Sequence, residues 1–227
     1  MRIGIIGAMQ MEVDALQAAM NQPVSESVSG ITIVRGSIGR HEIIAAVCGI
    51  GKVFAAMCAQ TMILRYQPQG IINIGVAGTV TSGLKVLDIA VADNVCQHDM
   101  DTSPLGDPVG LISGINQIYF PANKALAQAI GAAADKLGIR HTTGTIASGD
   151  QFIHTQEKKT WIHETFNAIA AEMEGGSIGH VCTVNQVPFA VLRTISDGDG
   201  GTMDYNTFAQ KAALQSIDVI MEALAVL

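Results

Sequence analysis

The segment AIAAEMEGGSIGHV, residues 168–181, runs from an apolar stretch into two glutamates and two glycines, and then into a second apolar stretch. The first stretch predicts a buried strand over 168–173, and the spacing after the glycines predicts a helix over 175–186. A strand followed directly by a helix is the building unit of α/β proteins. Glu172 and Glu174 stand at the turn between the two. Ionised acids are rarely buried without a partner, so their position requires an explanation.

Similar strand and helix patterns alternate along the rest of the chain. Apolar runs predict strands at 2–8, 31–38, 41–50, 70–78, 88–97, 142–148 and 188–196, and helical periods predict helices at 9–20, 52–66, 123–138, 157–166 and 205–225. Several of these strands are apolar at consecutive positions, which is typical of a sheet covered on both faces. The sequence therefore predicts a three-layer αβα protein with a central mixed β-sheet, in a single domain spanning 1–227.

Composition excludes two classes of partner. The net charge is −7, and the 13 Lys and Arg residues are scattered rather than clustered. We therefore expect no binding to nucleic acid or to an anionic membrane. The first residues resemble neither a signal peptide nor a membrane span, which favours a cytoplasmic protein.

The residues that often bind metals or form disulfides do not have the spacing for either role. Cys48, Cys58, Cys96 and Cys182 lie in apolar contexts without a C-x-x-C pair, which is typical of buried, reduced thiols. The HDMD stretch at 98–101 has no matching third cluster, so we expect no metal site. The glycine pair in GIGKV, 49–53, fits neither a dinucleotide fingerprint nor a P-loop, and we expect no cofactor.

Polar residues follow several of the predicted strands, at the edge where ligands gather in α/β folds. They are Glu12, Asn73, Asp150, Glu172, Glu174, Arg193, Ser196 and Asp197. The set is mainly acidic. It therefore excludes a site built chiefly to hold phosphate, and it favours recognition of hydroxyl groups together with proton transfer.

Glu12 has two possible interpretations from spacing alone. In a helix over 9–20, Glu12 lies roughly 70° from the centre of the apolar stripe and Asp14 roughly 130° away, so we expect Glu12 to be buried at its edge and Asp14 to be solvated. Glu12 either stabilises the positive end of that helix, worth about 0.3 to 1 kcal/mol, or serves the site. The spacing favours neither.

Six motifs, in this order, extend the analysis beyond spacing. IGIIGAMQMEVDAL, CGIGKVFAA, IINIGVAG, SGDQFI, EMEGGSIGHV and RTISDGD span nearly the whole chain. Together they resemble the 5′-methylthioadenosine/S-adenosylhomocysteine nucleosidases of the nucleoside phosphorylase superfamily. The resemblance implies a nucleoside phosphorylase-like fold. It also implies hydrolysis of the N-glycosidic bond of 5′-methylthioadenosine, S-adenosylhomocysteine and 5′-deoxyadenosine.

The same resemblance implies catalytic roles for four residues. Asp197 would be the general acid at purine N7, with Ser196 orienting its carboxyl group. Glu12 would be the base or anchor for the attacking water, assisted by Arg193.

Binding roles are also implied by the resemblance. Glu174 would accept hydrogen bonds from the ribose hydroxyls while Met173 packs on the sugar, which requires a bend at the glycines that follow. The purine would stack on Phe152 and meet the backbone of Ile153. The other residues implied to contact the nucleoside are Ile50, Met9 and Tyr205 at the 5′ end, Val76, Ala77 and Gly78 in the turn after 70–78, and Glu172, which has a less defined role.

A homodimer is the remaining implication, with the 98–114 loop of one subunit, including Thr102 and Leu105, closing over the site of the other. Two residues depart from the family pattern. Val76 stands where many members carry serine, and Leu105 replaces an aromatic residue; much of 106–120 also differs. These departures bear on the rate and on the preferred 5′ substituent.

Three alternatives remain open at this point. A phosphorylase of the same fold is disfavoured, because Glu12 would repel phosphate. An aminodeoxyfutalosine hydrolase is compatible with Tyr205 and the altered loop. A noncatalytic nucleoside-binding protein has no need to bury Glu12, Glu174 and Asp197 together.

Overall fold

A single mixed β-sheet of eleven strands forms the centre of the molecule, which is a computed structural model describing residues 1–227. The strand order is β2-β3-β4-β1-β5-β11-β6-β10-β9-β7-β8. The strands are β1 (Arg2–Gly7), β2 (Asn21–Val28), β3 (Ile31–Ile38), β4 (His41–Val47), β5 (Gly70–Asn73), β6 (Val76–Thr79), β7 (Ile89–Gln97), β8 (Phe120–Pro121), β9 (His141–Ser148), β10 (Ala168–Glu172) and β11 (Phe189–Asp197). The predicted mixed sheet is confirmed.

Part of this sheet closes on itself. β11 pairs with β6 and also with β7, while β6 pairs with β10, β10 with β9 and β9 with β7. These five strands form a closed hydrogen-bonded ring. An open sheet of β5, β1, β4, β3 and β2 extends from β11, and β8 pairs with β7. All nine residues of β11, which belongs to both parts, are buried.

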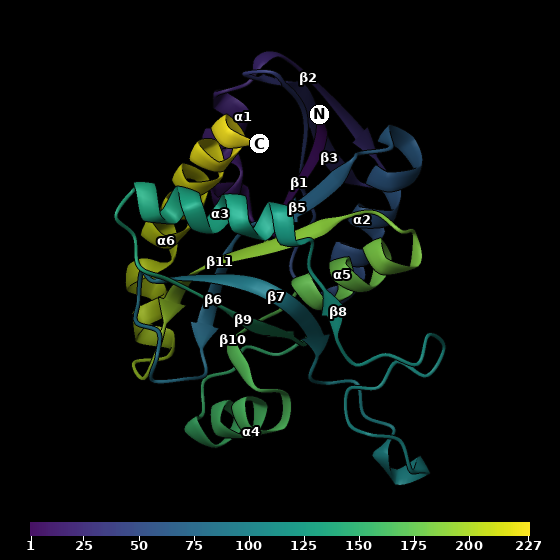
Figure 1. Ribbon diagram of the computed structural model, residues 1–227, viewed down its shortest axis with the longest axis vertical. Helices are drawn as coiled ribbons and strands as arrows, with labels where there is room; N and C mark the ends of the chain where they lie inside the picture. Colours follow the sequence, from purple (N-terminus) through teal and green to yellow (C-terminus); the bar gives the residue numbers. More distant parts are fainter.

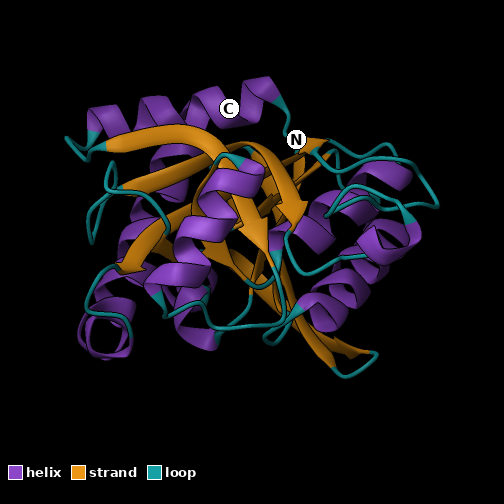
Figure 2. Ribbon diagram, turned by 90° about the horizontal axis from the view of Figure 1, so that it is seen from below, coloured by secondary structure: helices purple, strands orange, loops and turns teal.

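Helices cover both faces of the sheet and give the three predicted layers (Figures 1 and 2). One buried cluster packs β-strand residues against α2 (Lys52–Tyr66) and α5 (Gly175–Val184). A second cluster packs the opposite face against α1 (Asp14–Ala18), α3 (Lys124–Lys136) and α6 (Thr202–Val226). α4 (Gln156–Phe166) covers β9 and β10 with a third cluster (lower part of Figure 1).

The predicted helix over 9–20 is wrong in detail. A 3₁₀ turn, η1 (Gln10–Glu12), precedes the short helix α1, and Val13 between them has a φ of −127° that no continuous α-helix permits. The carboxylate of Glu12 binds the backbone N–H groups of Ala8 and Met9, which holds this tight turn in place. Glu12 is buried and Asp14 exposed, as expected.

Three further differences concern strands. The predicted strand over 70–78 is two strands, β5 and β6, because Gly75 between them adopts a φ of 154° that favours glycine. β2 was not predicted, since its residues NQPVSESV are mostly polar and exposed and it lies at the edge of the sheet. The two-residue β8 is too short to carry a sequence pattern.

Two other predictions concern the chain as a whole. All four cysteines are buried free thiols, which confirms their interpretation. None of the helices combines the length and the apolar character that crossing a bilayer requires.

Candidate active site

A cavity of about 290 Å³ opens at the carboxyl ends of β1, β10 and β11, beside β6. It brings together most of the predicted binding residues from seven separate parts of the chain. The lining residues are Ala8, Met9, Glu12, Ile50, Val76, Ala77, Gly78, Gln151, Phe152, Ile153, Ala171, Glu172, Met173, Glu174, Ser196, Asp197 and Tyr205. Ala8, Gln151 and Ala171 were not predicted. No group of three or more His, Cys, Asp or Glu side chains is arranged to hold a metal ion.

Glu12 lines the cavity from η1 and is 2% exposed. Its Oε2 accepts hydrogen bonds from the N–H groups of Ala8 at 2.7 Å and Met9 at 2.9 Å, and its Oε1 accepts one from Val76 at 3.2 Å. Burial raises the pKa of Glu12, while the charge of Arg193 and the three N–H groups oppose that rise. One carboxylate therefore organises its own turn and also faces the cavity.

Gly75 is the reason that Glu12 fits. A Cβ atom at Gly75 would stand 2.7 Å from Glu12 Oε1, closer than a Cβ can approach an oxygen, and it would make a tight contact of 3.3 Å with Arg193 Nη1. The glycine thus keeps space for the carboxylate as well as adopting the unusual φ.

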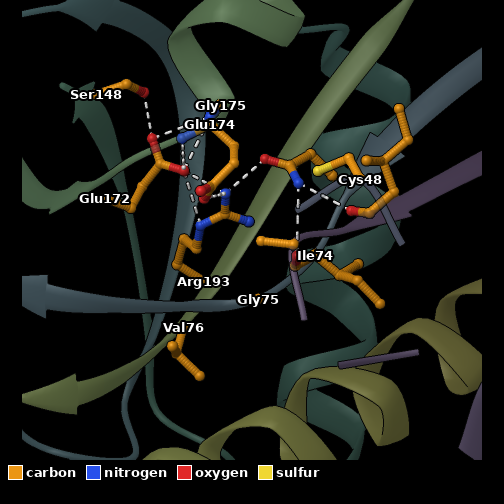
Figure 3. Close-up of polar contacts among 12 residues, drawn as sticks. Cys48, Ile74, Gly75, Val76, Ser148, Glu172, Glu174, Gly175 and Arg193 are labelled. Carbon is orange, nitrogen blue, oxygen red and sulfur yellow. Dashed lines mark hydrogen bonds and ion pairs between the residues drawn. The ribbon is translucent and has the colours of Figure 1, made fainter. Parts of the chain in front are cut away.

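Arg193 is fully buried and connects three parts of the site without lining the cavity (Figure 3). Its guanidinium donates to Glu172 and, at 2.5 Å, to Asn73 Oδ1, and its Nη2 lies 3.6 Å from Glu174 Oε2. Asn73 in turn donates to the carbonyl of Ile6 at 2.8 Å. A buried cation is costly unless it is paired, and Arg193 is paired here with carboxylates and an amide oxygen.

Both carboxylate oxygens of Glu172 are engaged in hydrogen bonds within the protein. Its oxygens accept from Arg193, from the Ser148 hydroxyl, and from the N–H groups of Glu174 at 3.0 Å and Gly175 at 2.8 Å. The last two are free N–H groups at the start of α5, where a negative charge is favourable. Because of these partners, the pKa of Glu172 is lowered despite complete burial.

Glu174 has the opposite character. Its Oε1 accepts one hydrogen bond, from Gly51 N–H at 2.9 Å, at the start of α2. Burial, followed by the nearby charge of Glu172, raises the pKa of Glu174 to about 7, and Arg193 opposes the rise. The backbone bends at Glu174, with φ −133° and ψ −43°, so Met173 and Glu174 line the same cavity as predicted.

Asp197 is the last residue of β11, and only one of its two carboxylate oxygens accepts a hydrogen bond. Oδ1 accepts from the Ser196 hydroxyl at 2.8 Å, and Oδ2 is buried without a hydrogen-bond partner. A side chain at Gly78 would stand 2.7 Å from Oδ2, so only glycine leaves room for it. Burial is the largest cause of the raised pKa of Asp197.

Aromatic and apolar side chains form the rest of the wall. Phe152 is 44% exposed, and its ring lies edge-to-face with Tyr205, with centroids 5.5 Å apart. The Tyr205 hydroxyl donates to Met9 Sδ at 3.5 Å. One end of the cavity is thus apolar with a single hydroxyl, and the other end is acidic.

The comparisons with known proteins agree with this geometry. A family model described as the phosphorylase superfamily matches residues 2–225.

The chain belongs to the phosphorylase superfamily.

Within the superfamily it belongs with the nucleosidases. The 5′-methylthioadenosine/S-adenosylhomocysteine nucleosidase of Haemophilus influenzae (strain PittEE) is 37% identical over 227 residues, covering 99% of each chain. The S-adenosylhomocysteine nucleosidase of Streptococcus pyogenes, solved in complex with 5-methylthiotubericidin, superposes with a TM-score of 0.95 at 31% identity, covering 100% of this chain and 97% of the other. A futalosine hydrolase mutant of Helicobacter pylori strain 26695 superposes with a TM-score of 0.94 at 34% identity, covering 100% and 99%. The predicted nucleoside phosphorylase-like fold is confirmed.

Three predicted residues of this phosphorylase superfamily chain lie outside the cavity. Arg193 stands behind the acids as described. Thr102 and Leu105 belong to a segment that projects from the body (lower right in Figure 1), and Leu105 is 84% exposed. Neither touches the cavity of its own chain.

Residues that support the site went unnoticed in the sequence. Gly51 and Ser148 hold Glu174 and Glu172, and Gly75 makes room for Glu12. The only sequence signal for these residues is their place at the ends of strands, inside the motifs IINIGVAG, CGIGKVFAA and SGDQFI. Their contacts join positions more than 20 residues apart, which no local pattern reports.

Ser148→Ala tests the buried support of Glu172. The Ser148 hydroxyl donates to Glu172 and accepts from Gly176 N–H at 2.5 Å, so the substitution leaves both groups short of a partner. We expect the free energy of unfolding to fall by about 1 to 3 kcal/mol, measured by urea denaturation. Ser113→Ala, at an exposed position, is the matched control and should change it by less than about 0.5 kcal/mol. Equal effects from the two variants would contradict the importance of this support.

Proposed function

We propose that this protein hydrolyses the N-glycosidic bond of 5′-methylthioadenosine and S-adenosylhomocysteine, and of 5′-deoxyadenosine, releasing adenine and the corresponding ribose. The observation that carries the proposal is the arrangement of Glu12, Glu174 and Asp197 around one cavity, in a chain related to named nucleosidases over its full length. The reduced cysteines are consistent with a cytoplasmic enzyme.

In the proposed reaction, Asp197 acts on the leaving group. As the C1′–N9 bond breaks, its electron pair passes into the purine, and the carboxyl of Asp197 gives its proton to N7. The raised pKa of Asp197 supports this role, because burial favours the protonated form of the carboxyl, which is the form that a general acid needs. Ser196 holds the other oxygen and so fixes the direction of Oδ2.

Glu12 acts on water at the opposite side of the sugar. The oxygen of a water molecule forms the new bond to C1′, and Glu12 takes one of its protons. The raised pKa of Glu12 makes it a stronger base than an exposed glutamate, and Arg193 favours its ionised form. Val76 offers Glu12 its backbone N–H and has no side-chain hydroxyl to hold the water.

Glu174 binds the ribose hydroxyls in this proposal, and Met173 packs against the sugar. The Oε2 of Glu174 accepts no hydrogen bond within the chain and lies 3.6 Å from Arg193. Ala77 and Gly78 provide the narrow wall beside the purine. Glu172 takes a supporting rather than a binding role, since its acceptors are used by the protein.

The ionisation of Glu174 gives the reaction a pH dependence. Its pKa of about 7 lies above the ordinary value of 4.5, so the folded protein holds this proton more tightly than the unfolded chain does. The contribution of this proton to the stability of the fold is therefore fully present below pH 4.5, and it is lost as the pH rises through about 7. Ribose binding should instead become stronger as the pH rises, because the ionised carboxylate of Glu174 is a better hydrogen-bond acceptor than the protonated carboxyl.

We therefore expect KM for methylthioadenosine to rise several-fold as the pH is lowered from about 8 to about 6, with a smaller change in kcat. Steady-state kinetics across this range measure both constants. Glu174→Gln should have a higher KM that no longer depends on pH in this interval. A wild-type KM that is flat with pH would contradict the ribose-binding role.

The adenine is held by Phe152 and the backbone of Ile153, and the 5′ substituent lies between Met9, Ile50 and Tyr205. Ile50 is 53% exposed, so this end of the cavity is open in the single chain. A homodimer completes it in our proposal, with the segment carrying Thr102 and Leu105 lying over the partner's cavity. The exposed apolar Leu105 supports such a contact.

Hydrolysis is favoured over phosphorolysis by charge. Phosphate at about 4 Å from ionised Glu12 would cost about 4 kcal/mol at an effective dielectric constant of about 20. Arg193, the cation nearest to Glu12 within the site, is already engaged by Glu172 and Asn73.

The test is adenine release from methylthioadenosine by the purified protein, with and without phosphate, with the sugar product identified by mass. Free methylthioribose formed at a rate independent of phosphate supports the proposal. Methylthioribose 1-phosphate would overturn the argument from charge, and no release of adenine would overturn the substrate assignment.

A second candidate substrate has support of its own. The neighbour named futalosine hydrolase is as similar in structure as the nucleosidases are, and the Tyr205 hydroxyl offers a polar contact at the 5′ end. Aminodeoxyfutalosine carries a bulky polar group at that position. Comparing kcat/KM for the two substrates in wild type and in Tyr205→Phe distinguishes them. Removal of the hydroxyl should lower kcat/KM for aminodeoxyfutalosine, which has the polar 5′ group, and leave kcat/KM for methylthioadenosine unchanged.

A further inference from the structure

Lys159 is a buried cation that the proposed mechanism does not use. It lies on α4, is 4% exposed, and its ammonium group donates to the carbonyl of Gly198. No carboxylate lies within 4 Å of its nitrogen. A buried ammonium without a counter-ion in contact is costly, so the position of Lys159 requires an explanation.

The Gly198 carbonyl that it binds follows Asp197 directly. Asp197 is the last residue of β11, and the turn over 198–201 leads from it into α6. Lys159 therefore fixes one side of the turn that starts at the proposed general acid, although Lys159 does not line the cavity itself.

Asp204 holds the same turn from the other side. Its Oδ2 accepts hydrogen bonds from the N–H groups of Gly198 and Gly200, both at 3.1 Å. A side chain at Gly200 would stand 2.2 Å from Asp204 Oδ1, so the backbone lies directly on this carboxylate. The turn is thus bound by two side chains of opposite charge, since Lys159 donates to its carbonyl group and Asp204 accepts from its N–H groups.

We propose that Lys159 and Asp204 are opposed positioning residues, which fix the turn after Asp197 and set how readily that carboxyl gives up its proton. The part of this inference that concerns catalysis rests on the proposed function. The charges act in opposite senses on Asp197, because the cation favours the ionised carboxylate and the anion favours the protonated acid. The pKa of Asp197, raised mainly by burial, is lowered by Lys159 and raised by Asp204.

Other ionisable groups near Asp197 do not duplicate this effect. Those that share the cavity with it are Glu12, Glu172, Glu174 and Tyr205, and none of them carries a positive charge. Arg193 is occupied by Glu172 and Glu174 behind the cavity wall. Lys159 is therefore the cation bound directly to the turn that follows Asp197.

The experiment measures the titration of Asp197 directly, by ¹³C NMR of its side-chain carboxyl in protein labelled at aspartate. The signal is assigned by its loss in Asp197→Asn. Lys159→Met should raise the pKa of Asp197 and Asp204→Asn should lower it, each by about 0.5 to 1 unit. Lys159→Arg keeps the charge and should restore the wild-type value. The pKa of Asp197 in the double variant Lys159→Met/Asp204→Asn should lie between its values in the two single variants.

The alkaline limb of kcat/KM against pH should move in the same two directions. A role confined to folding would lower activity or stability in both variants without separating their titrations. Shifts of the same sign in the two variants, or no shift in either, would overturn the inference. Asp204→Asn keeps an oxygen acceptor on a half-buried side chain, and an unchanged or raised pKa of Asp197 in this variant would overturn the inference even if Lys159→Met does not fold.

The NMR titration needs no substrate, so failure of the proposed function is seen separately. Opposed shifts of the carboxyl signal without adenine release would overturn the substrate and leave the charge pair in place. Adenine release that requires Asp197, without opposed shifts, would overturn the charge pair alone.

Discussion

Asp197→Asn is expected to lower kcat for adenine release by about 10³-fold or more while leaving nucleoside affinity within a few-fold of wild type. The substitution keeps the size of the side chain and an oxygen that can accept from Ser196. It removes the proton donor, so the purine must leave without protonation. Turnover of a saturating concentration of methylthioadenosine measures the loss, and calorimetric titration with a non-hydrolysable analogue of methylthioadenosine measures the affinity.

Asp199→Asn is the matched control for this substitution. Asp199 is exposed, lies two residues further along the chain and does not line the cavity, so its variant should retain wild-type turnover. If Asp197→Asn turned over at a rate similar to Asp199→Asn, the assignment of the general acid would be wrong.

Glu12→Gln should lower kcat by about 10²- to 10⁴-fold, because the amide cannot take a proton from water. A second effect arises from the hydrogen bonds of Glu12. The glutamine oxygen can serve Ala8 and Met9, but its NH₂ group then faces the N–H of Val76, where Oε1 now accepts at 3.2 Å. A lower Tm should accompany the loss of turnover.

The two effects of Glu12→Gln are separated by measuring kcat well below the Tm of the variant. Asp14→Asn, on the exposed side of the same segment, is the control and should change neither quantity. Turnover near the wild-type value would show that water is activated by another group.

The sequence predicted the α/β fold because the strands that matter are buried on both faces. β11 is apolar along most of its length, and its pattern ends in the polar residues of the site. The acids at the ends of β10 and β11 were therefore found from position alone. Their proposed roles needed the family resemblance, because nothing in the spacing distinguishes a ribose ligand such as Glu174 from an internal support such as Glu172.

What the sequence missed depends on contacts between distant residues. Periodicity indicated one helix over 9–20, but the carboxylate of Glu12 binds the amides of its own turn and favours a 3₁₀ geometry. Arg193 was expected to assist Glu12, and its pairing with Glu172 places it behind the cavity wall, from where its charge acts on Glu12. No motif in the sequence singles out Lys159, whose burial results from packing of α4 over the turn after β11.

The closed ring of five strands has a consequence for the newly made chain. The ring is completed only when β11, residues Phe189–Asp197, pairs with β6 and β7, which are about a hundred residues earlier. Such distant pairings form late, because a long loop of chain must first be closed. A ribosome-bound chain that ends before β11 lacks Arg193 and Asp197, and its ring stays open, so Glu172 has no buried cation to meet. The complete cavity therefore forms only near the end of synthesis, because a chain that ends before β11 already carries Glu12, Glu172 and Glu174 but has neither Arg193 nor Asp197.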